Sequence, residues 1–202
     1  FTLSGFLITT LLLAEHDRHG RTDLRRFWSR RFRRLLPASW LCLAGVLVFA
    51  VTVATSAQLV TLRREVPAAL AEVANWQLIR SGTSYADIFT APSPVQHFWS
   101  LAIEEQFYLL FPLFMVGLFA LGRRRGDPRR TVAAGLGVAI AASLLVTWLL
   151  RDAPVDRIYY GTDTRSAELT VGALLAVGLH GRRVPRAWVD VVAWVGLAAL
   201  GV

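Results

Sequence analysis

Long apolar segments separated by short polar connections dominate the pattern of the chain. Phe98–Leu121 holds 24 residues, which as a helix would measure about 36 Å and exceed a hydrocarbon core of about 30 Å. This pattern predicts an all-α fold, a polytopic bundle of transmembrane helices, in place of a soluble domain with one core. The six predicted membrane segments are Phe1–Ala14, Pro37–Ala57, Phe98–Leu121, Thr131–Leu150, about Thr164–Leu179, and Ala187–Val202.

The two terminal apolar segments are shorter than a membrane span. A transmembrane helix needs about 20 residues, whereas these segments hold 14 and 16. The first residue, Phe1, is also not a start methionine. We therefore expect residues 1–202 to form a single membrane domain that is an internal piece of a longer protein, truncated at both ends.

Positive charge is concentrated in alternate connections. All 22 basic residues are arginines, and connections 15–34, 122–130 and 181–186 hold 8, 5 and 3 of them, whereas 58–97 and 151–165 hold 3 each. Arginine-rich connections are typical of the cytoplasmic side, so the first three are predicted to be cytoplasmic and the other two external. Because membrane segments divide the arginines among separate loops, the net charge of +8 does not indicate nucleic-acid binding.

The arginine-rich arm before Pro37 has its apolar side chains at helical spacing, following a predicted N-cap at Thr22. We expect this arm to lie in the membrane interface, with Pro37 in the first turn of the next span. Its arginines allow two interpretations. They anchor the chain to anionic lipid, or they form a phosphate-binding surface in which Arg31 and Arg34 share one pyrophosphate.

Two adjacent acids, Glu104 and Glu105, lie inside an apolar segment, where carboxylates are costly and usually functional. Helical spacing places His97, Ser100, Glu104 and Tyr108 on one face, which is expected to line a water-accessible cavity open to the outer side. Glu104 would lie near the floor of this cavity and exchange a proton there. Glu105 is rotated by about 100° from the stripe, and an interhelical ion pair is an equally open interpretation for it.

Residues 159–165 place hydroxyl groups, a carboxylate and a guanidinium beside a predicted span. They are explained either by an aromatic belt with a helix cap or by a polar rim that receives a hydroxylated acceptor. The sequence contains no histidine and cysteine spacing typical of a metal site, and no glycine-rich nucleotide loop. Neither a metal nor a bound cofactor is therefore expected.

Several stretches together resemble the membrane acyltransferase family 3, the O-acetylase group. They occur in the order of that family and extend over most of the chain. The stretches are Leu3–Thr9, Phe27–Pro37, His97–Leu101 with Glu104–Leu109, and Tyr160–Leu169 with Gly172–Ala176.

The resemblance implies an enzyme of the bacterial cytoplasmic membrane with about ten helices, of which about six are predicted here. Such an enzyme takes an acetyl or other acyl group from cytoplasmic acyl-CoA, its donor substrate. It transfers that group to a hydroxyl of an extracytoplasmic carbohydrate or glycolipid. The family's proposed catalytic histidine lies upstream of its first motif and has no counterpart in this sequence.

The resemblance also suggests roles for residues in the motifs. The residues expected to bind acyl-CoA are Arg30, Arg31 and Arg34. Those expected to be catalytic are His97, Ser100, Glu104 and Glu105. Those expected to bind the acceptor are Tyr108, Tyr160, Thr162 and Arg165.

A transporter or flippase of a lipid-linked or small polar substrate is the alternative function. In that case Glu104 would act as a proton relay. Many transporters are built from inverted repeats, and the acidic motif has no counterpart in a second half of this chain. The sequence therefore favours the acyltransferase.

Overall fold

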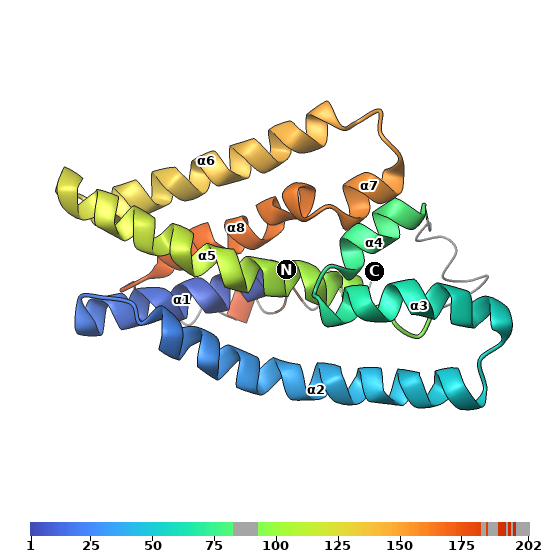
Figure 1. The fold of residues 1–202 in the computed structure, drawn as a ribbon. Coiled ribbons are helices and arrows are strands. Elements are labelled where there is room, and N and C mark those ends of the chain that lie inside the picture. Colours follow the sequence, from blue (N-terminus) through green and yellow to red (C-terminus); the bar gives the residue numbers. More distant parts are fainter. Residues whose placement is uncertain (83–92, 183–184, 186–189, 193, 195, 197–202) are drawn as a thin grey trace.

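The computed structural model describes residues 1–82, 93–182, 185, 190–192, 194 and 196, and every regular element in these ranges is an α-helix (Figure 1). The helices are α1 (Thr2–His19), α2 (Leu24–Thr52), α3 (Ser56–Leu70), α4 (Ala74–Ser81), α5 (Phe98–Arg125), α6 (Pro128–Leu149), α7 (Val155–Tyr160) and α8 (Thr162–Leu179).

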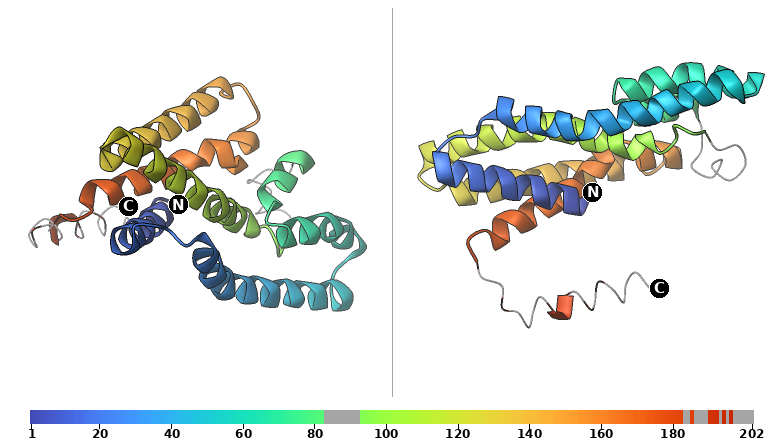
Figure 2. Two further views of the ribbon diagram at one scale, coloured as in Figure 1. Left: turned by 60° about the vertical axis from the view of Figure 1, so that its left-hand side comes forward. Right: turned by 90° about the horizontal axis from the view of Figure 1, so that it is seen from below.

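Helix α5 occupies the centre of the bundle. It contacts α1, α2, α3, α4, α6 and α8, while α6 and the α2–α3 pair lie on opposite sides of it (Figures 1 and 2). One core cluster includes Ile8 of α1, Ile103 and Met115 of α5, Leu136 of α6 and Leu169 of α8, all of them fully buried. A substitution in the core face of α5 would therefore alter the packing of most of the other helices.

Close packing of α1 against α8 depends on two glycines. A Cβ atom at Gly5 would lie 1.8 Å from the carbonyl oxygen of Leu169, and one at Gly172 would lie 1.9 Å from that of Thr2. Small residues let helix backbones approach in this way in membrane bundles. The contact fixes α1 beside the bundle, with Ser4 turned toward α5.

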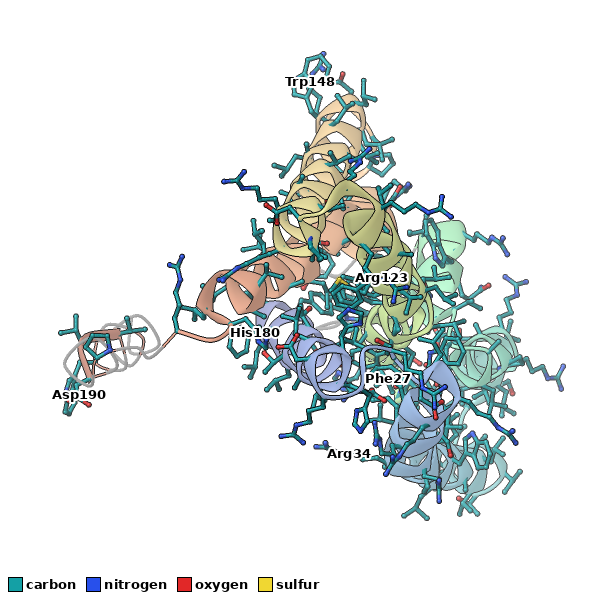
Figure 3. All side chains as sticks on the ribbon, turned by 90° about the vertical axis from the view of Figure 1, so that its left-hand side faces the viewer. Phe27, Arg34, Arg123, Trp148, His180 and Asp190 are labelled. Atoms are coloured by element: carbon teal, nitrogen blue, oxygen red, sulfur yellow. The ribbon has the colours of Figure 1, made fainter. Side chains whose placement is uncertain are left out.

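The arginine-rich connections lie at one end of the bundle. The last turns of α1, α5 and α8 and the first turns of α2 and α6 meet there, at the left in Figure 1 and toward the viewer in Figure 3. This arrangement is consistent with the prediction that these connections lie on the same side of the membrane. Of the connection 181–186, residues 183, 184 and 186 lie outside the described residues.

Three described helices are long and apolar enough to cross a membrane: α2, α5 and α6. Both α2 and α6 expose large apolar side chains, such as Leu41, Val51 and Val138, as expected for helices whose outer faces lie in lipid. The predicted segments at 1–14 and 164–179 are helices as well, α1 and α8. Each has 18 residues but carries three acidic or arginine side chains, and neither is among the three candidate spans. The predicted segment 187–202 lies largely outside the described residues.

The predicted break between the arginine-rich arm and the second span is wrong. Helix α2 runs without interruption from Leu24 to Thr52, and Pro37 lies inside it. Proline lacks an amide hydrogen, so one backbone carbonyl in the preceding turn has no donor, and its ring crowds that turn. Because Pro37 is exposed, both effects lie on the outer face of α2. The N-cap is Asp23, not Thr22, because the Asp23 side chain accepts the backbone N–H of Arg26 at 3.0 Å.

Two helices that the sequence pattern did not predict lie largely within the connection 58–97. Helix α3 begins with a capping box between Thr55 and Gln58 and turns back along α2. Helix α4 then packs on α5 and α7. These contacts bring the polar residues of α4 beside the acidic motif.

Candidate functional site

The centre of the site is a hydrogen-bonded group of three side chains. The Tyr108 hydroxyl donates to Oε2 of Glu104 at 2.7 Å, and Ser4 Oγ of α1 donates to the same oxygen at 3.0 Å. Ser4 and Tyr108 also contact each other through their hydroxyls. Glu104 and Tyr108 are one helical turn apart on α5, so the predicted stripe is real at these positions. Ser4, for which the sequence pattern predicted no role, completes the group.

Arg31 of α2 joins this group from the arginine-rich end. Its guanidinium lies over the Tyr108 ring at 3.8 Å from the ring centre, an arrangement typical of a cation–π contact. One turn earlier, the Trp28 indole N–H donates to the backbone carbonyl of Tyr108 at 3.1 Å. Trp28 and Arg31 thus hold α2 in register with α5.

Glu105 points to another side of α5 than Glu104. Its side chain is 5% exposed, and neither carboxylate oxygen has a hydrogen-bond partner among the described residues. The charges close enough to act on it are those of Glu72, Arg31 and Glu104. An interhelical ion pair with direct contact, which remained open from the sequence, is not formed by Glu105 within the described part of the chain.

A cleft of about 550 Å³ opens between α1 and α2 at the arginine-rich end. It is lined by five arginines and one carboxylate, that of Glu15. The other lining residues are Leu11, Ala14, His19 and Phe27. Arg34, at the lower side of Figure 3, lies on the α1–α2 side of the molecule, opposite α6. The five arginines are Arg18, Arg26, Arg30, Arg31 and Arg34, so all three residues predicted to bind acyl-CoA lie here.

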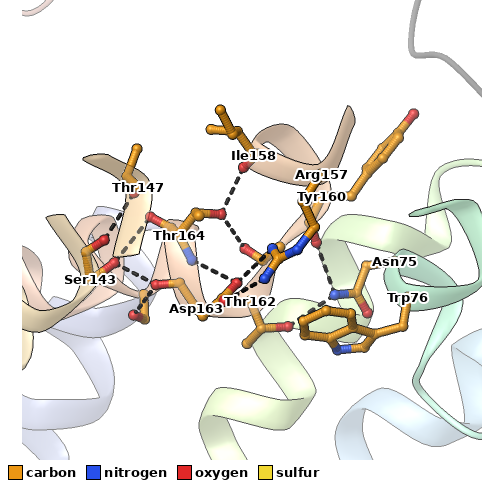
Figure 4. Close-up of polar contacts among 12 residues, drawn as sticks. Asn75, Trp76, Ser143, Thr147, Arg157, Ile158, Tyr160, Thr162, Asp163 and Thr164 are labelled. Carbon is orange, nitrogen blue, oxygen red and sulfur yellow. Dashed lines mark hydrogen bonds and ion pairs between the residues drawn. The ribbon is translucent and has the colours of Figure 1, made fainter. Parts of the chain in front are cut away.

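A second polar cluster ties α4 and α8 to the residue after the acidic pair. Gln106 donates to Asn75 Oδ1 at 3.0 Å and accepts the hydroxyl of Thr162 at 2.6 Å. Asn75, which is fully buried, also donates to Thr162 Oγ1 and to the Tyr160 carbonyl, both at 2.9 Å (Figure 4). We call Asn75, Gln106 and Thr162 the polar junction. Thr162 is therefore engaged in contacts within the protein.

An ion pair lies beside the polar junction. Arg157 donates two hydrogen bonds to Asp163, at 2.9 and 2.6 Å, and its guanidinium lies over the Trp76 ring (Figure 4). This bidentate contact outweighs burial and holds the pKa of Asp163 below its usual range. From α6, Ser143 donates to the Asp163 carbonyl at 2.6 Å. The start of α8 is thus fixed from α6 and α7.

The remaining predicted acceptor residues are also held by the protein. Arg165 donates to the Tyr159 carbonyl at 2.9 Å and to Glu168 at 2.5 Å. Tyr160 is fully buried, and its ring packs against Trp99 and Tyr159. Tyr108, predicted to belong with them, lies instead in the interior with Glu104.

His97 and Ser100 lie at the start of α5, apart from the Glu104 group. His97 is the exposed N-cap residue, and Ser100 Oγ donates to its backbone carbonyl at 3.3 Å. The stripe predicted from spacing is therefore joined by hydrogen bonds only in its inner half. Among the residues described, no three His, Cys, Asp or Glu side chains are grouped so that they could hold a metal ion.

Some residues of the site carried no usable signal in the sequence. Asn75 lies in a connection without clear periodicity, and Arg157 lies in one of the two connections that hold few arginines. Ser4 did carry a signal, a polar side chain inside an apolar helix, but its partner is 100 residues away. Such pairings are decided by tertiary contacts.

Comparison with known proteins decides the family. A family model described as an acyltransferase domain, of the acyltransferase 3 type, matches residues 1–202. This chain belongs to the acyltransferase 3 family. No solved structure matches this acyltransferase 3 chain.

Curated relatives of this acyltransferase 3 chain include peptidoglycan O-acetyltransferases. It is 39% identical over 176 residues to peptidoglycan O-acetyltransferase OatA of Listeria monocytogenes, a match that covers 87% of this chain and 28% of that protein. It is 38% identical over 177 residues to O-acetyltransferase OatA of Staphylococcus aureus, with 87% and 28% coverage. The chain thus spans little more than a quarter of the length of these curated relatives.

Proposed function

We propose that this acyltransferase 3 chain serves in peptidoglycan O-acetylation, moving an acetyl group from acetyl-CoA at the arginine-rich end to a glycan hydroxyl on the other side of the membrane. Family membership and the names of the relatives support this reaction class. One structural observation carries the proposal. Arg31 lines the arginine cleft and also contacts Tyr108, whose hydroxyl binds Glu104.

The charge and size of the cleft suit the donor. Coenzyme A carries a pyrophosphate and a further phosphate, and arginine forks bind phosphate oxygens with two hydrogen bonds. Five arginines against one lining carboxylate give the cleft a strong positive charge. Its volume of about 550 Å³ falls within the range of about 300–1,000 Å³ usual for small-molecule sites. Arg30 and Arg34 are proposed as phosphate ligands because both are exposed at its mouth.

The Glu104 group is proposed as the reacting centre. In the overall reaction the oxygen–hydrogen bond of the acceptor and the carbon–sulfur bond of the thioester break. An ester carbon–oxygen bond forms, and the proton ends on the departing sulfur. A carboxylate held between two hydroxyl donors is suited to accept and return a proton of that kind. Glu105, buried beside Arg31, is proposed to set the local charge.

The outer side of the site is proposed to receive the glycan. The bundle end opposite the arginine-rich end carries the N-terminus of α5, the polar junction and Arg165. By the positive-inside rule this end faces outward. Because Tyr160, Thr162 and Arg165 are already bonded within the protein, we assign them to shaping the acceptor entrance. His97 and Ser100 lie at the same entrance.

The test uses the full-length protein that carries this sequence, in membrane vesicles with acetyl-CoA labelled in its acetyl group and peptidoglycan fragments as acceptors. We expect label on the glycan with the native sequence and its loss with Glu104→Gln, which keeps the size of the side chain but removes its charge. Arg33→Ala is the matched control, since Arg33 is exposed, bonds to Ser29 on its own helix and does not line the cleft.

The folded state of each variant is checked by its insertion and thermal unfolding in detergent. Failure of the folded native protein to transfer label, with several acyl donors and glycans supplied, would overturn the proposal. Transport of a lipid-linked glycan in the same vesicles, dependent on Glu104 and on a proton gradient, would point to the transporter that the sequence left as the alternative.

A further inference from the structure

The five arginines of the cleft do not have the same surroundings. Arg18, Arg26, Arg30 and Arg34 are exposed, whereas Arg31 is half-buried. Arg31 also reaches deepest into the bundle, because one side of its guanidinium is covered by the Tyr108 ring. The cleft therefore has an exposed outer group of arginines and a single inner one.

Arg31 carries an unused hydrogen-bond donor in the interior. Its Nε atom is buried and has no hydrogen-bond partner among the described residues. Buried polar groups are almost always hydrogen-bonded, and a buried donor without a partner is destabilising. Trp28 nevertheless holds this part of α2 in place, through its bond to the Tyr108 carbonyl. An unsatisfied donor that the surrounding structure fixes in place is suited to a ligand oxygen.

The charges around Arg31 select the kind of oxygen. Glu105 lies close enough for its carboxylate to interact with the Arg31 charge, and Glu104 binds the same tyrosine that Arg31 covers. A phosphate placed here would bring further negative charge beside two carboxylates in a low-dielectric interior, which is strongly unfavourable. A neutral carbonyl oxygen carries no such penalty.

We propose that Arg31 binds the thioester carbonyl oxygen of the donor, while the exposed arginines, Arg30 and Arg34 among them, bind its phosphates. The inference rests on the proposed acyl-CoA function and divides the arginine motif into two tasks. It differs from the sequence-based expectation that Arg31 and Arg34 share one pyrophosphate. The oxygen is neutral in the bound donor and becomes negative only when the acceptor attacks, and Arg31 is then the positive charge that offsets it against the two carboxylates.

The first test compares acetyl-CoA with the phosphate-free thioester S-acetyl-N-acetylcysteamine in the labelled transfer assay. Arg34→Ala should raise the KM for acetyl-CoA about tenfold, as expected for one lost charged hydrogen bond, and leave the phosphate-free donor unaffected. Arg31→Ala should lower kcat about 100-fold with both donors. Arg33→Ala should match the native protein with both.

The second test needs no turnover and measures binding of free coenzyme A, which has the phosphates but no thioester carbonyl. Arg34→Ala should weaken binding about tenfold, whereas Arg31→Lys and Arg31→Ala should bind as the native protein does. Arg31→Lys keeps the positive charge and serves if Arg31→Ala does not fold. In the transfer assay it should remain well below native kcat, because an ammonium cannot reproduce the planar contact with Tyr108.

Two results would overturn the division of tasks. One is a weakening of coenzyme A binding by Arg31→Lys that equals the effect of Arg34→Ala. The other is native transfer from the phosphate-free donor by Arg31→Ala. Either result with an active native protein leaves the proposed function standing, whereas a native protein that neither binds coenzyme A nor transfers acetyl removes both.

Discussion

Arginines occur at both ends of the bundle, but their surroundings differ. At the α7–α8 end, Arg157 and Arg165 use their donors on Asp163, Glu168 and a backbone carbonyl. In the cleft between α1 and α2, Arg30 reaches Glu15 only at 3.8 Å, and the buried Nε donor of Arg31 has no partner in the part of the chain that the structure describes. An arginine whose donors are used by the protein fixes the fold, whereas one with open donors is available to a ligand.

The same contrast applies to the two polar clusters on α5. Around Gln106, the junction residues satisfy one another and connect α4, α5 and α8. One residue earlier, Glu105 is buried without a hydrogen bond among the described residues. Fully satisfied polar networks rigidify a core, whereas a buried group without a hydrogen bond needs another explanation, such as a bound ligand or a proton transfer. Two adjacent positions on α5 thus differ in whether the described part of the protein satisfies their polar groups.

The largest expected effect separates donor binding in the cleft from the stability of the fold. Replacing Arg30 and Arg34 together by alanine should raise the KM for acetyl-CoA about 100-fold, because two charged contacts to phosphate are lost. Thermal unfolding should be unchanged, since both side chains are exposed and the contact of Arg30 with Glu15 is long. A large loss of thermal stability with an unchanged KM would reverse the assignment of this cleft.

The converse is expected for the polar junction. Asn75→Ala should lower the free energy of unfolding by about 2 kcal/mol, because it removes a fully buried amide that hydrogen-bonds to Gln106, Thr162 and the Tyr160 carbonyl. Denaturant or thermal unfolding in detergent measures the change. The KM for acetyl-CoA should stay near the native value. A rise comparable with that of the arginine variants would mean that the junction contributes to donor binding.

A smaller effect tests the link between the two clusters. Tyr108→Phe keeps the ring beneath Arg31 but removes the hydroxyl that binds Glu104 and contacts Ser4. We expect kcat to fall about tenfold and the KM for acetyl-CoA to stay constant. Ser4→Ala, which removes the weaker bond at 3.0 Å, is the matched comparison and should reduce kcat less. Equal rates for the native protein and Tyr108→Phe would contradict a role for this hydroxyl.

The smallest expected effect is the pH dependence of the Arg157–Asp163 pair. Because the pKa of Asp163 is lowered in the folded protein, its contribution to stability is present above the unfolded value of about 3.9 and is lost as pH falls through the folded value. Asp163→Asn should cost about 1 kcal/mol at neutral pH, a modest figure because the pair is partly exposed. Unfolding midpoints measured from pH 6 to pH 3 should therefore converge for the two proteins.

Much of the helical architecture could be predicted from the sequence. The segments around Phe98–Leu121 and Thr131–Leu150 correspond to α5 and α6. Prediction was wrong at Pro37, where local propensity favours a helix start but the continuous apolar pattern of α2 prevails. Helices α3 and α4 were not predicted because packing on α2, α5 and α7, not periodicity, stabilises them. For the site, spacing along α5 correctly placed Glu104 with Tyr108, and the predicted arginines of α2 line one cleft. The contacts that Ser4 and Asn75 make from other helices were not predicted.

The sequence by itself determined which residue types lie in the membrane and which connections carry the arginines. Apolar runs and charge bias are properties of the chain taken in order, and the bilayer acts on each segment separately. Only the tertiary structure decided that Ser4 contacts Glu104 and that Arg31, in contrast to the other arginines of the cleft, covers the Tyr108 ring. It also decided that Thr162 is bonded to Asn75. These contacts depend on how α1, α2, α4 and α8 pack around α5, and helix packing follows from the shapes of whole surfaces, which no single segment encodes.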